Sequence, residues 1–190
     1  MKRTLLLNLL NAYTPSEPEE LLYKEEMLEF LQKEENCFER SLEIGHFTAS
    51  SWLLNKTKDQ ALLMHHAKLN IWCQLGGHCD GESDLLAVAI KEAKEESGIS
   101  KIAPLQKEIY DIDIHVIPAN PKEKEHKHYD IRFLLYVVSE EQPIQNHESK
   151  ALLWIDKKNS TLPSQEQSIL RMHKKWQKLD REEPDHQNSH

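Results

Sequence analysis

The most regular pattern of apolar and polar positions in this chain lies between residues 85 and 97. Four apolar residues recur there at the spacing of one helical face: Leu86, Ala89, Ile90 and Ala93. Ser83 or Asp84 can cap the start of such a helix, and Gly98 lies where helices commonly end. The pattern therefore predicts one amphipathic helix whose apolar stripe packs on the rest of the protein.

Helices are also predicted at both ends of the chain. The first covers residues 2–12, and the second runs from a capping-box signal at Ser16 and Glu19 to about Lys33. A closing helix is predicted over 165–179. The two leading helices are expected to pack on the core as an extension.

Between these helices the apolar residues follow the period of β-strands. Strands are predicted over 47–54, 61–66, 102–105, 109–117, 128–138 and 151–155. Pattern and length alone give one domain of the α/β or α+β class. We expect residues 1–40 to form the helical extension, 41–180 the domain, and 181–190 a disordered tail.

Composition narrows the possible partners and the compartment. The 190 residues suffice for one domain with a real core, and a net charge of −8 gives no general affinity for nucleic acid or anionic membranes. The apolar run after Met1 is too short for a membrane span and lacks a signal-peptide cleavage site. Three cysteines without a CxxC pair indicate reduced thiols and favour a cytoplasmic protein.

Three carboxylates lie beside the apolar stripe of the central helix. Glu92, Glu95 and Glu96 fall within about one helical turn, where like charges repel each other. On an arbitrary helix such residues form a solvated acidic face. Here they border the buried stripe and follow a glycine-rich loop that carries Asp80 and Glu82. Because Mg²⁺ prefers carboxylate oxygens and phosphates as ligands, the pattern favours a metal site.

The segment GGHCDGESDLLAVAIKEAKEESGI resembles the Nudix box, G-x5-E-x7-R-E-U-x-E-E-x-G-U, in which U is a bulky apolar residue. Six residues match the box in register: Gly77, Glu92, Glu95, Glu96, Gly98 and Ile99. Three positions depart from it, since Ser83 replaces the first glutamate, Lys91 replaces the arginine, and Ala93 is small. The resemblance extends over about residues 45–154. It implies an α/β/α sandwich with a mixed sheet, preceded here by the helical extension.

The resemblance also implies roles for individual residues. Glu92, Glu95 and Glu96 are expected to bind Mg²⁺, with Mn²⁺ as a possible substitute, and Gly77 is expected to offer its carbonyl. Lys91 is expected to orient a glutamate as the arginine of the box does, although an ammonium lacks the planar fork of a guanidinium. Gly76 allows the backbone to approach phosphates. A glutamate in a later loop is the general base of some Nudix enzymes, which points to Glu148.

For two acidic residues and several histidines, the sequence allows more than one interpretation. Asp80 and Glu82 are either outer metal ligands or residues that shape the loop. His78, His115 and His128 are expected to contact the substrate; the alternatives are a Zn²⁺ site that includes His126, and plain solvent exposure. Arg132 is expected to hold a phosphate in a bidentate manner.

The function implied by the resemblance is Mg²⁺-dependent hydrolysis of a pyrophosphate bond. The substrate is expected to be a small nucleoside diphosphate linked to another group, cleaved by water attack on phosphorus in a monomer or homodimer. Ser83 and Lys91 support the alternative of a nucleotide sensor that has lost turnover. The intact glutamates favour the enzyme.

Overall fold

The computed structural model describes residues 2–121, 123–158 and 161–179. Its four helices are α1 (Thr4–Ala12), α2 (Pro18–Lys33), α3 (Leu85–Ser97) and α4 (Gln167–Leu179). Its eight strands are β1 (Gly45–Leu54), β2 (Gln60–His66), β3 (Trp72–Cys73), β4 (Leu75–His78), β5 (Ile102–Pro104), β6 (Asp111–Ile117), β7 (His126–Val137) and β8 (Ser149–Asp156).

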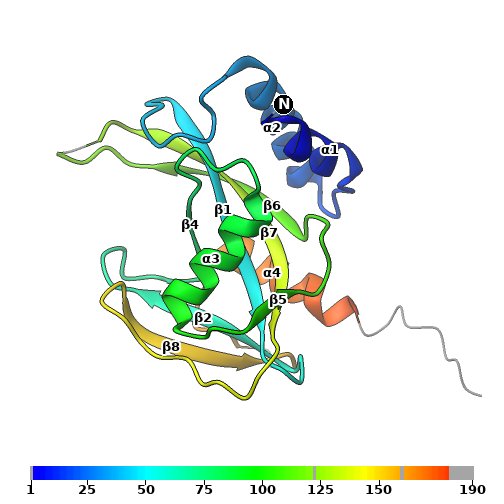
Figure 1. Ribbon diagram of the computed structural model, residues 1–190, viewed down its shortest axis with the longest axis vertical. Helices are drawn as coiled ribbons and strands as arrows, with labels where there is room; N and C mark the ends of the chain where they lie inside the picture. The colour runs from blue at the N-terminus through cyan, green and yellow to red at the C-terminus, as the bar shows by residue number, and fades with distance from the viewer. Residues whose placement is uncertain (1, 122, 159–160, 180–190) are drawn as a thin grey trace, which may run out of the picture.

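The strands form one mixed sheet (Figure 1). β1 and β7 pair in parallel over ten residues, from Gly45 with Lys127 to Leu54 with Tyr136, whereas the other pairs are antiparallel. β4 pairs with β1, and β6 pairs with β7, so all four meet at one part of the sheet. This arrangement lets residues far apart in the sequence share one face.

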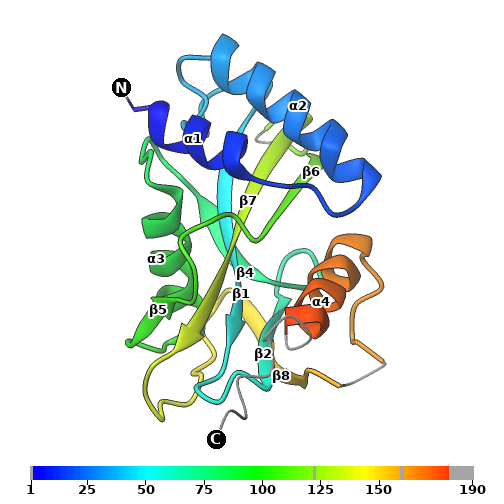
Figure 2. The same cartoon turned by 90° about the vertical axis from the view of Figure 1, so that its right-hand side faces the viewer.

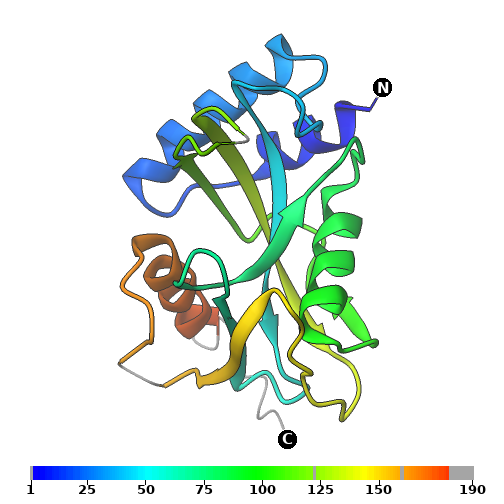
Figure 3. The ribbon, with the colours of Figure 1, turned by 90° about the vertical axis from the view of Figure 1, so that its left-hand side faces the viewer.

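Helices cover the sheet on two sides (Figure 2). α3 lies on one side, α4 lies on the other, and α1 and α2 cross one end. The opposite view in Figure 3 shows the same layers. One apolar core joins the sheet to α1, α2 and α3, and a second core, which includes Trp52 and Trp176, joins it to α4. The predicted α/β/α sandwich with an N-terminal helical extension is therefore confirmed.

Details at two predicted elements differ. The capping box predicted at Ser16 and Glu19 lies one residue later, because Glu17 is the N-cap and the Glu20 carboxylate accepts the Glu17 amide at 2.9 Å. Strand β4 lies where a glycine-rich loop was predicted, since Gly76 and Gly77 pair with β1 in spite of their weak strand propensity. The tail predicted over 181–190 lies outside the described residues.

The N-terminal helices are joined to the domain by apolar and ionic contacts. Phe30 of α2 stacks on Tyr129 of β7 with ring centroids 4.1 Å apart. The buried Glu20 carboxylate bonds Tyr13 and Lys175, and Lys175 also reaches Asp111 at 2.7 Å. α1 and α2 thus complete the interior of the domain.

A search of the helices in the described part of the chain finds none with both the length and the apolar character needed to cross a bilayer.

Candidate active site

Helix α3 turns two glutamates toward the sheet. Its start is capped by Asp84, whose carboxylate accepts the Ala87 amide at 3.1 Å, and Gly98 ends it with a left-handed backbone at φ 70°. The residues buried along the helix are Leu85, Val88, Ala89, Ala93, Glu96 and Ser97. The apolar stripe is therefore rotated from the predicted one, since Leu86 and Ile90 are only partly buried. This rotation brings Glu92 and Glu96 onto the inner face.

Glu96 is the most enclosed of the three carboxylates. It is 4% exposed, and its Oε2 accepts the backbone amide of Gly76 at 2.8 Å. Burial, and then the neighbouring carboxylates of Glu92, Glu148 and Glu95, raise the pKa of Glu96 to about 8, although the Gly76 amide favours the anion. Among the ion pairs of the described residues none involves Glu96, since Lys91 pairs with Glu92 and Glu95.

Glu92 lies directly beneath the second glycine of β4. A Cβ atom added at Gly77 would stand 2.5 Å from its Oε2 atom, so only glycine allows this approach. Lys91 contacts Oε1 of Glu92 at 2.9 Å and Oε2 of Glu95 at 3.0 Å. The Glu92 side chain is 16% exposed and that of Glu95 is 58% exposed. The lysine thus pairs with two of the expected ligands from the solvent side.

Glu148 approaches the same cluster from the loop before β8. Its negative charge contributes to the raised pKa of Glu96. The loop is held against α3 by two hydrogen bonds, from the Ile144 amide to the Ser97 carbonyl at 2.7 Å and from Asn146 to the Glu95 carbonyl at 3.1 Å. The fold therefore brings together Glu92, Glu95, Glu96 and Glu148, which the sequence proposed as a group.

The two acidic residues of the loop after β4 have other partners. Asp80 forms a two-bond ion pair with Arg40, with distances of 2.5 and 2.6 Å. Glu82 is exposed and accepts the amides of Ser83 and Asp84 at 2.7 and 3.0 Å. These contacts favour the interpretation that both residues shape the loop. Arg40 was not selected from the sequence, where nothing marks it as a partner of a residue 40 positions away.

Arg132 does not lie where a substrate phosphate is expected. Its side chain is 2% exposed and pairs with Asp130 at 2.8 Å, Asp111 at 3.0 Å and Asp113 at 3.3 Å. Three buried carboxylates satisfy its guanidinium, so the predicted phosphate contact is wrong. The alternation of residues along β7 alone does not predict that three aspartates would surround the Arg132 guanidinium.

The histidines singled out from the sequence do come together. His115 and His128 face each other across β6 and β7, His126 lies two residues from His128, and His78 approaches from β4. A further histidine, His46, pairs with His128 in the parallel β1–β7 ladder and was missed. His46, Thr48 and Ser50 alternate along the strand and so share one face, which is a sign that the sequence offers. The parallel pairing of β1 with β7, however, cannot be predicted from the local sequence.

Two surface depressions lie away from these residues. One, of about 450 Å³, is lined by residues of α2 and α4 that include Glu19 and Arg171. The other, of about 420 Å³, is lined by residues that include Tyr13 and Tyr110. Neither depression contains a residue of α3 or β4. The candidate site is therefore identified by the carboxylates of α3 and not by a depression in the surface.

The α3 carboxylates have the ligand chemistry that a divalent cation prefers, although in the described part of the chain no three of them offer oxygens within 4.8 Å of one another. Glu96 is buried among like charges, Glu92 lies under the Gly77 backbone, and oxygen ligands of this kind suit Mg²⁺ and Mn²⁺. A bound cation would offset the repulsion that raises the pKa of Glu96.

Comparisons with known proteins agree with this geometry. The family model of the NUDIX domain matches residues 45–174, more than half of the chain. A hydrolase of the NUDIX family from Clostridium perfringens is 25% identical, with a TM-score of 0.52, over 70% of this chain and 97% of that one. No match was found among curated proteins.

More distant solved structures share the fold. A MutT protein from Methanosarcina mazei Go1 is 16% identical, with a TM-score of 0.56, over 74% of this chain and 99% of that one. An ADP-ribose pyrophosphatase from Streptococcus suis is 17% identical, with a TM-score of 0.51, over 73% and 93% of the two chains. The family model covers more than half of the chain, the residues of the box are in register, and α3 carries the carboxylates. This chain therefore belongs to the NUDIX family of hydrolases.

Proposed function

We propose that this protein hydrolyses a pyrophosphate bond in a small nucleoside diphosphate derivative, with Mg²⁺ or Mn²⁺ as its cofactor. The observation that carries the proposal is the position of Glu96, buried, bonded to the Gly76 amide and surrounded by the charges of Glu92, Glu95 and Glu148. A stabilising role alone would not place four acidic groups together, because their repulsion costs folding energy.

Glu92, Glu95 and Glu96 would hold the metal, together with the carbonyl of Gly77. The cation neutralises charge on bridging phosphate oxygens and lowers the pKa of water when bound. Lys91 keeps Glu92 and Glu95 in place through its two ion pairs. The glycines of β4 let the chain approach both the carboxylates and a substrate phosphate.

Glu148 is the proposed general base. It belongs to a loop fastened to the end of α3, so its carboxylate stays near Glu96 while the loop can still admit water. A carboxylate there would take a proton from the attacking water as the new bond to phosphorus forms and the bridging P–O bond breaks, which releases the other phosphate group with the bridging oxygen. His115, whose side chain is 41% exposed, lies on the face of the sheet opposite α3, so no contact with a substrate held by the α3 carboxylates is proposed for it.

The direct test is a panel of substrates with Mg²⁺ or Mn²⁺: nucleoside triphosphates, ADP-ribose, dinucleoside polyphosphates and nucleotide sugars. Release of a nucleotide is expected for at least one of them, and ¹⁸O from labelled water should appear in one of the two phosphate-containing products, because water attacks phosphorus. Tight nucleotide binding without any release, at saturating metal, would instead identify a sensor.

Variants assign the activity to the site. Glu96→Gln is expected to lower kcat by about 10³-fold or more, because it removes a charged metal ligand. Glu148→Gln should lower kcat by roughly 10²-fold, the usual contribution of a general base, with little change in metal affinity. Glu25→Gln, on the exposed face of α2, is the matched control and should retain full activity. Equal rates for Glu96→Gln and the control would overturn the assignment.

A further inference from the structure

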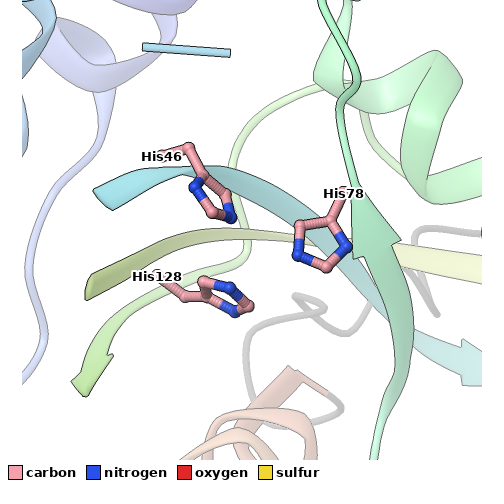
Figure 4. A group of neighbouring side chains, drawn as sticks. All are labelled: His46, His78 and His128. Atoms are coloured by element: carbon pink, nitrogen blue, oxygen red, sulfur yellow. The ribbon is translucent and has the colours of Figure 1, made fainter. Parts of the chain in front are cut away.

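Three histidines from three separate strands converge on one point (Figure 4). His46 lies on β1, His78 on β4 and His128 on β7, and one ring nitrogen of each lies within 4.8 Å of the others. Their ring centroids are 5.1, 4.8 and 5.0 Å apart. In the described part of the chain, no other group of three or more potential metal-ligating side chains meets this distance.

The register of the sheet explains the convergence. His46 pairs with His128 in the parallel ladder, and His78 pairs with Thr48, two residues after His46 and on the same face. Successive residues of a strand point to opposite faces. Because Gly77 faces Glu92 on α3, His78 faces the other side of β4. The histidine cluster is therefore separate from the α3 carboxylates.

His46 is buried without the hydrogen bonds that a buried imidazole needs. It is 2% exposed, and among the described residues neither of its ring nitrogens has a hydrogen-bond partner of normal geometry. A buried polar group without a partner destabilises the folded protein, so its presence requires an explanation.

Two further histidines border the cluster. His126 lies with its Nδ1 2.8 Å from the Lys124 carbonyl and its Nε2 3.3 Å from Nε2 of His128. Donation from Nδ1 of His126 to that carbonyl leaves its Nε2 able to accept a hydrogen bond from His128, and the other ring nitrogen of His128 is then available to a metal. His115 approaches the Asp113 carboxylate at 3.4 Å and pairs with His128 across β6 and β7.

We propose that His46, His78 and His128 form a zinc site whose fourth position is open to water or to a substrate oxygen. Imidazole nitrogens suit Zn²⁺, whereas Mg²⁺ requires oxygen ligands, so the two sites on opposite faces of β4 differ in metal preference. Two nitrogens bound to one tetrahedral Zn²⁺ lie roughly 3.3 Å apart. The rings therefore close by up to about 1.5 Å on binding, which side-chain rotation provides.

The test is metal titration of chelator-treated full-length protein, with Zn²⁺ followed by calorimetry and Co²⁺ followed by its visible ligand-field absorption. One equivalent of Zn²⁺ is expected to bind, and the Co²⁺ spectrum should be that of a four- or five-coordinate nitrogen site. His78→Gln and His128→Gln should each weaken Zn²⁺ binding about 100-fold. His65→Gln, which alters a histidine stacked on Trp72 outside the cluster, is the control and should bind as the wild type does.

Two further variants separate this proposal from the proposed hydrolase site. Glu96→Gln should bind Zn²⁺ normally, and His128→Gln should bind Mg²⁺ normally, because the two sets of ligands are distinct. His46→Gln is informative only with a circular dichroism check, since it changes a buried residue. Zn²⁺ binding that persists in the His78→Gln/His128→Gln double variant, or that is absent from the folded wild type, would overturn the zinc site and leave the hydrolase proposal intact.

Discussion

The backbone amide of Gly76 donates a 2.8 Å hydrogen bond to Oε2 of Glu96. This bond joins the strand that carries the glycines to the helix that carries the carboxylates. A hydrogen bond of this length is directional, so it fixes how closely the β4 backbone approaches the proposed metal ligands.

Mg²⁺ or Mn²⁺ is expected to stabilise the protein through Glu96. At a metal concentration of 100 times Kd, binding to the folded state adds about 2.7 kcal/mol to the free energy of unfolding, which raises Tm by several degrees. Thermal unfolding with and without metal measures the effect. Glu96→Gln should show no increase, whereas Glu25→Gln should match the wild type. An equal increase in the Tm of Glu96→Gln would show that the ion binds elsewhere.

The two glycines of β4 should respond differently to alanine. A Cβ at Gly76 would stand 2.2 Å from Cβ of Ser50 and 2.7 Å from the Ala49 carbonyl oxygen, so Gly76→Ala should cost about 2–4 kcal/mol of stability. The three atoms nearest to a Cβ at Gly77 all belong to the flexible Glu92 side chain. Gly77→Ala should therefore keep its stability within about 1 kcal/mol yet lose most of its activity, because Glu92 moves. Urea denaturation and kcat together separate the two effects.

Lys91 is expected to act on turnover and not on stability. Its side chain is 61% exposed, and exposed ion pairs contribute at most about 0.5–1 kcal/mol. Lys91→Met should slow turnover roughly 10-fold, because Glu92 and Glu95 lose the group that orients them. Lys91→Arg should restore the rate, since it retains the charge and presents its donors in a planar fork. A Lys91→Met variant with a normal rate would show that the ion pairs are incidental.

Glu20 should make the stability of the protein sensitive to acid. Burial acts to raise the pKa of Glu20, but hydrogen bonds from Lys175, Tyr13 and Ser16 outweigh it and bring the pKa to about 2, below its ordinary value of 4.5. The stabilisation is complete above pH 4.5 and is lost as the pH falls toward 2. Glu20→Gln should be less stable than the wild type by on the order of 2–3 kcal/mol at pH 7.

The measurement for Glu20 is urea denaturation across the pH range. The difference between Glu20→Gln and the wild type should narrow as the pH falls below 4.5, and Glu25→Gln should show no such trend. A difference that is constant with pH would mean that Glu20 stabilises by packing alone. The same network predicts that α1 and α2 are required for folding, because their removal would leave Lys175 and Arg171 without Glu20 and Glu19.

Local sequence patterns predicted the helices and most strands, because apolar residues recur with a different period in a helix and in a strand. The glutamates of α3 could be grouped from sequence since residues three and four apart on a helix are neighbours. Strand β4 was not predicted, because its two glycines have weak strand propensity and only the pairing with β1 makes them extended. Arg132 was placed wrongly because its three aspartate partners come from two strands, β6 and β7. His46 was missed for the same reason, since contact with His128 depends on a parallel pairing across 82 residues of chain.

Two consecutive residues of β4 face two different groups of side chains. Gly77 is directed to the carboxylates on one side, and His78 to the imidazoles on the other. An insertion or deletion of a single residue at this point would exchange the two sides, and would aim an imidazole at α3 and a bare backbone at the histidines. The length of this segment is therefore constrained as well as its composition, and relatives that retain both sets of ligands should show no gaps between Leu75 and Cys79.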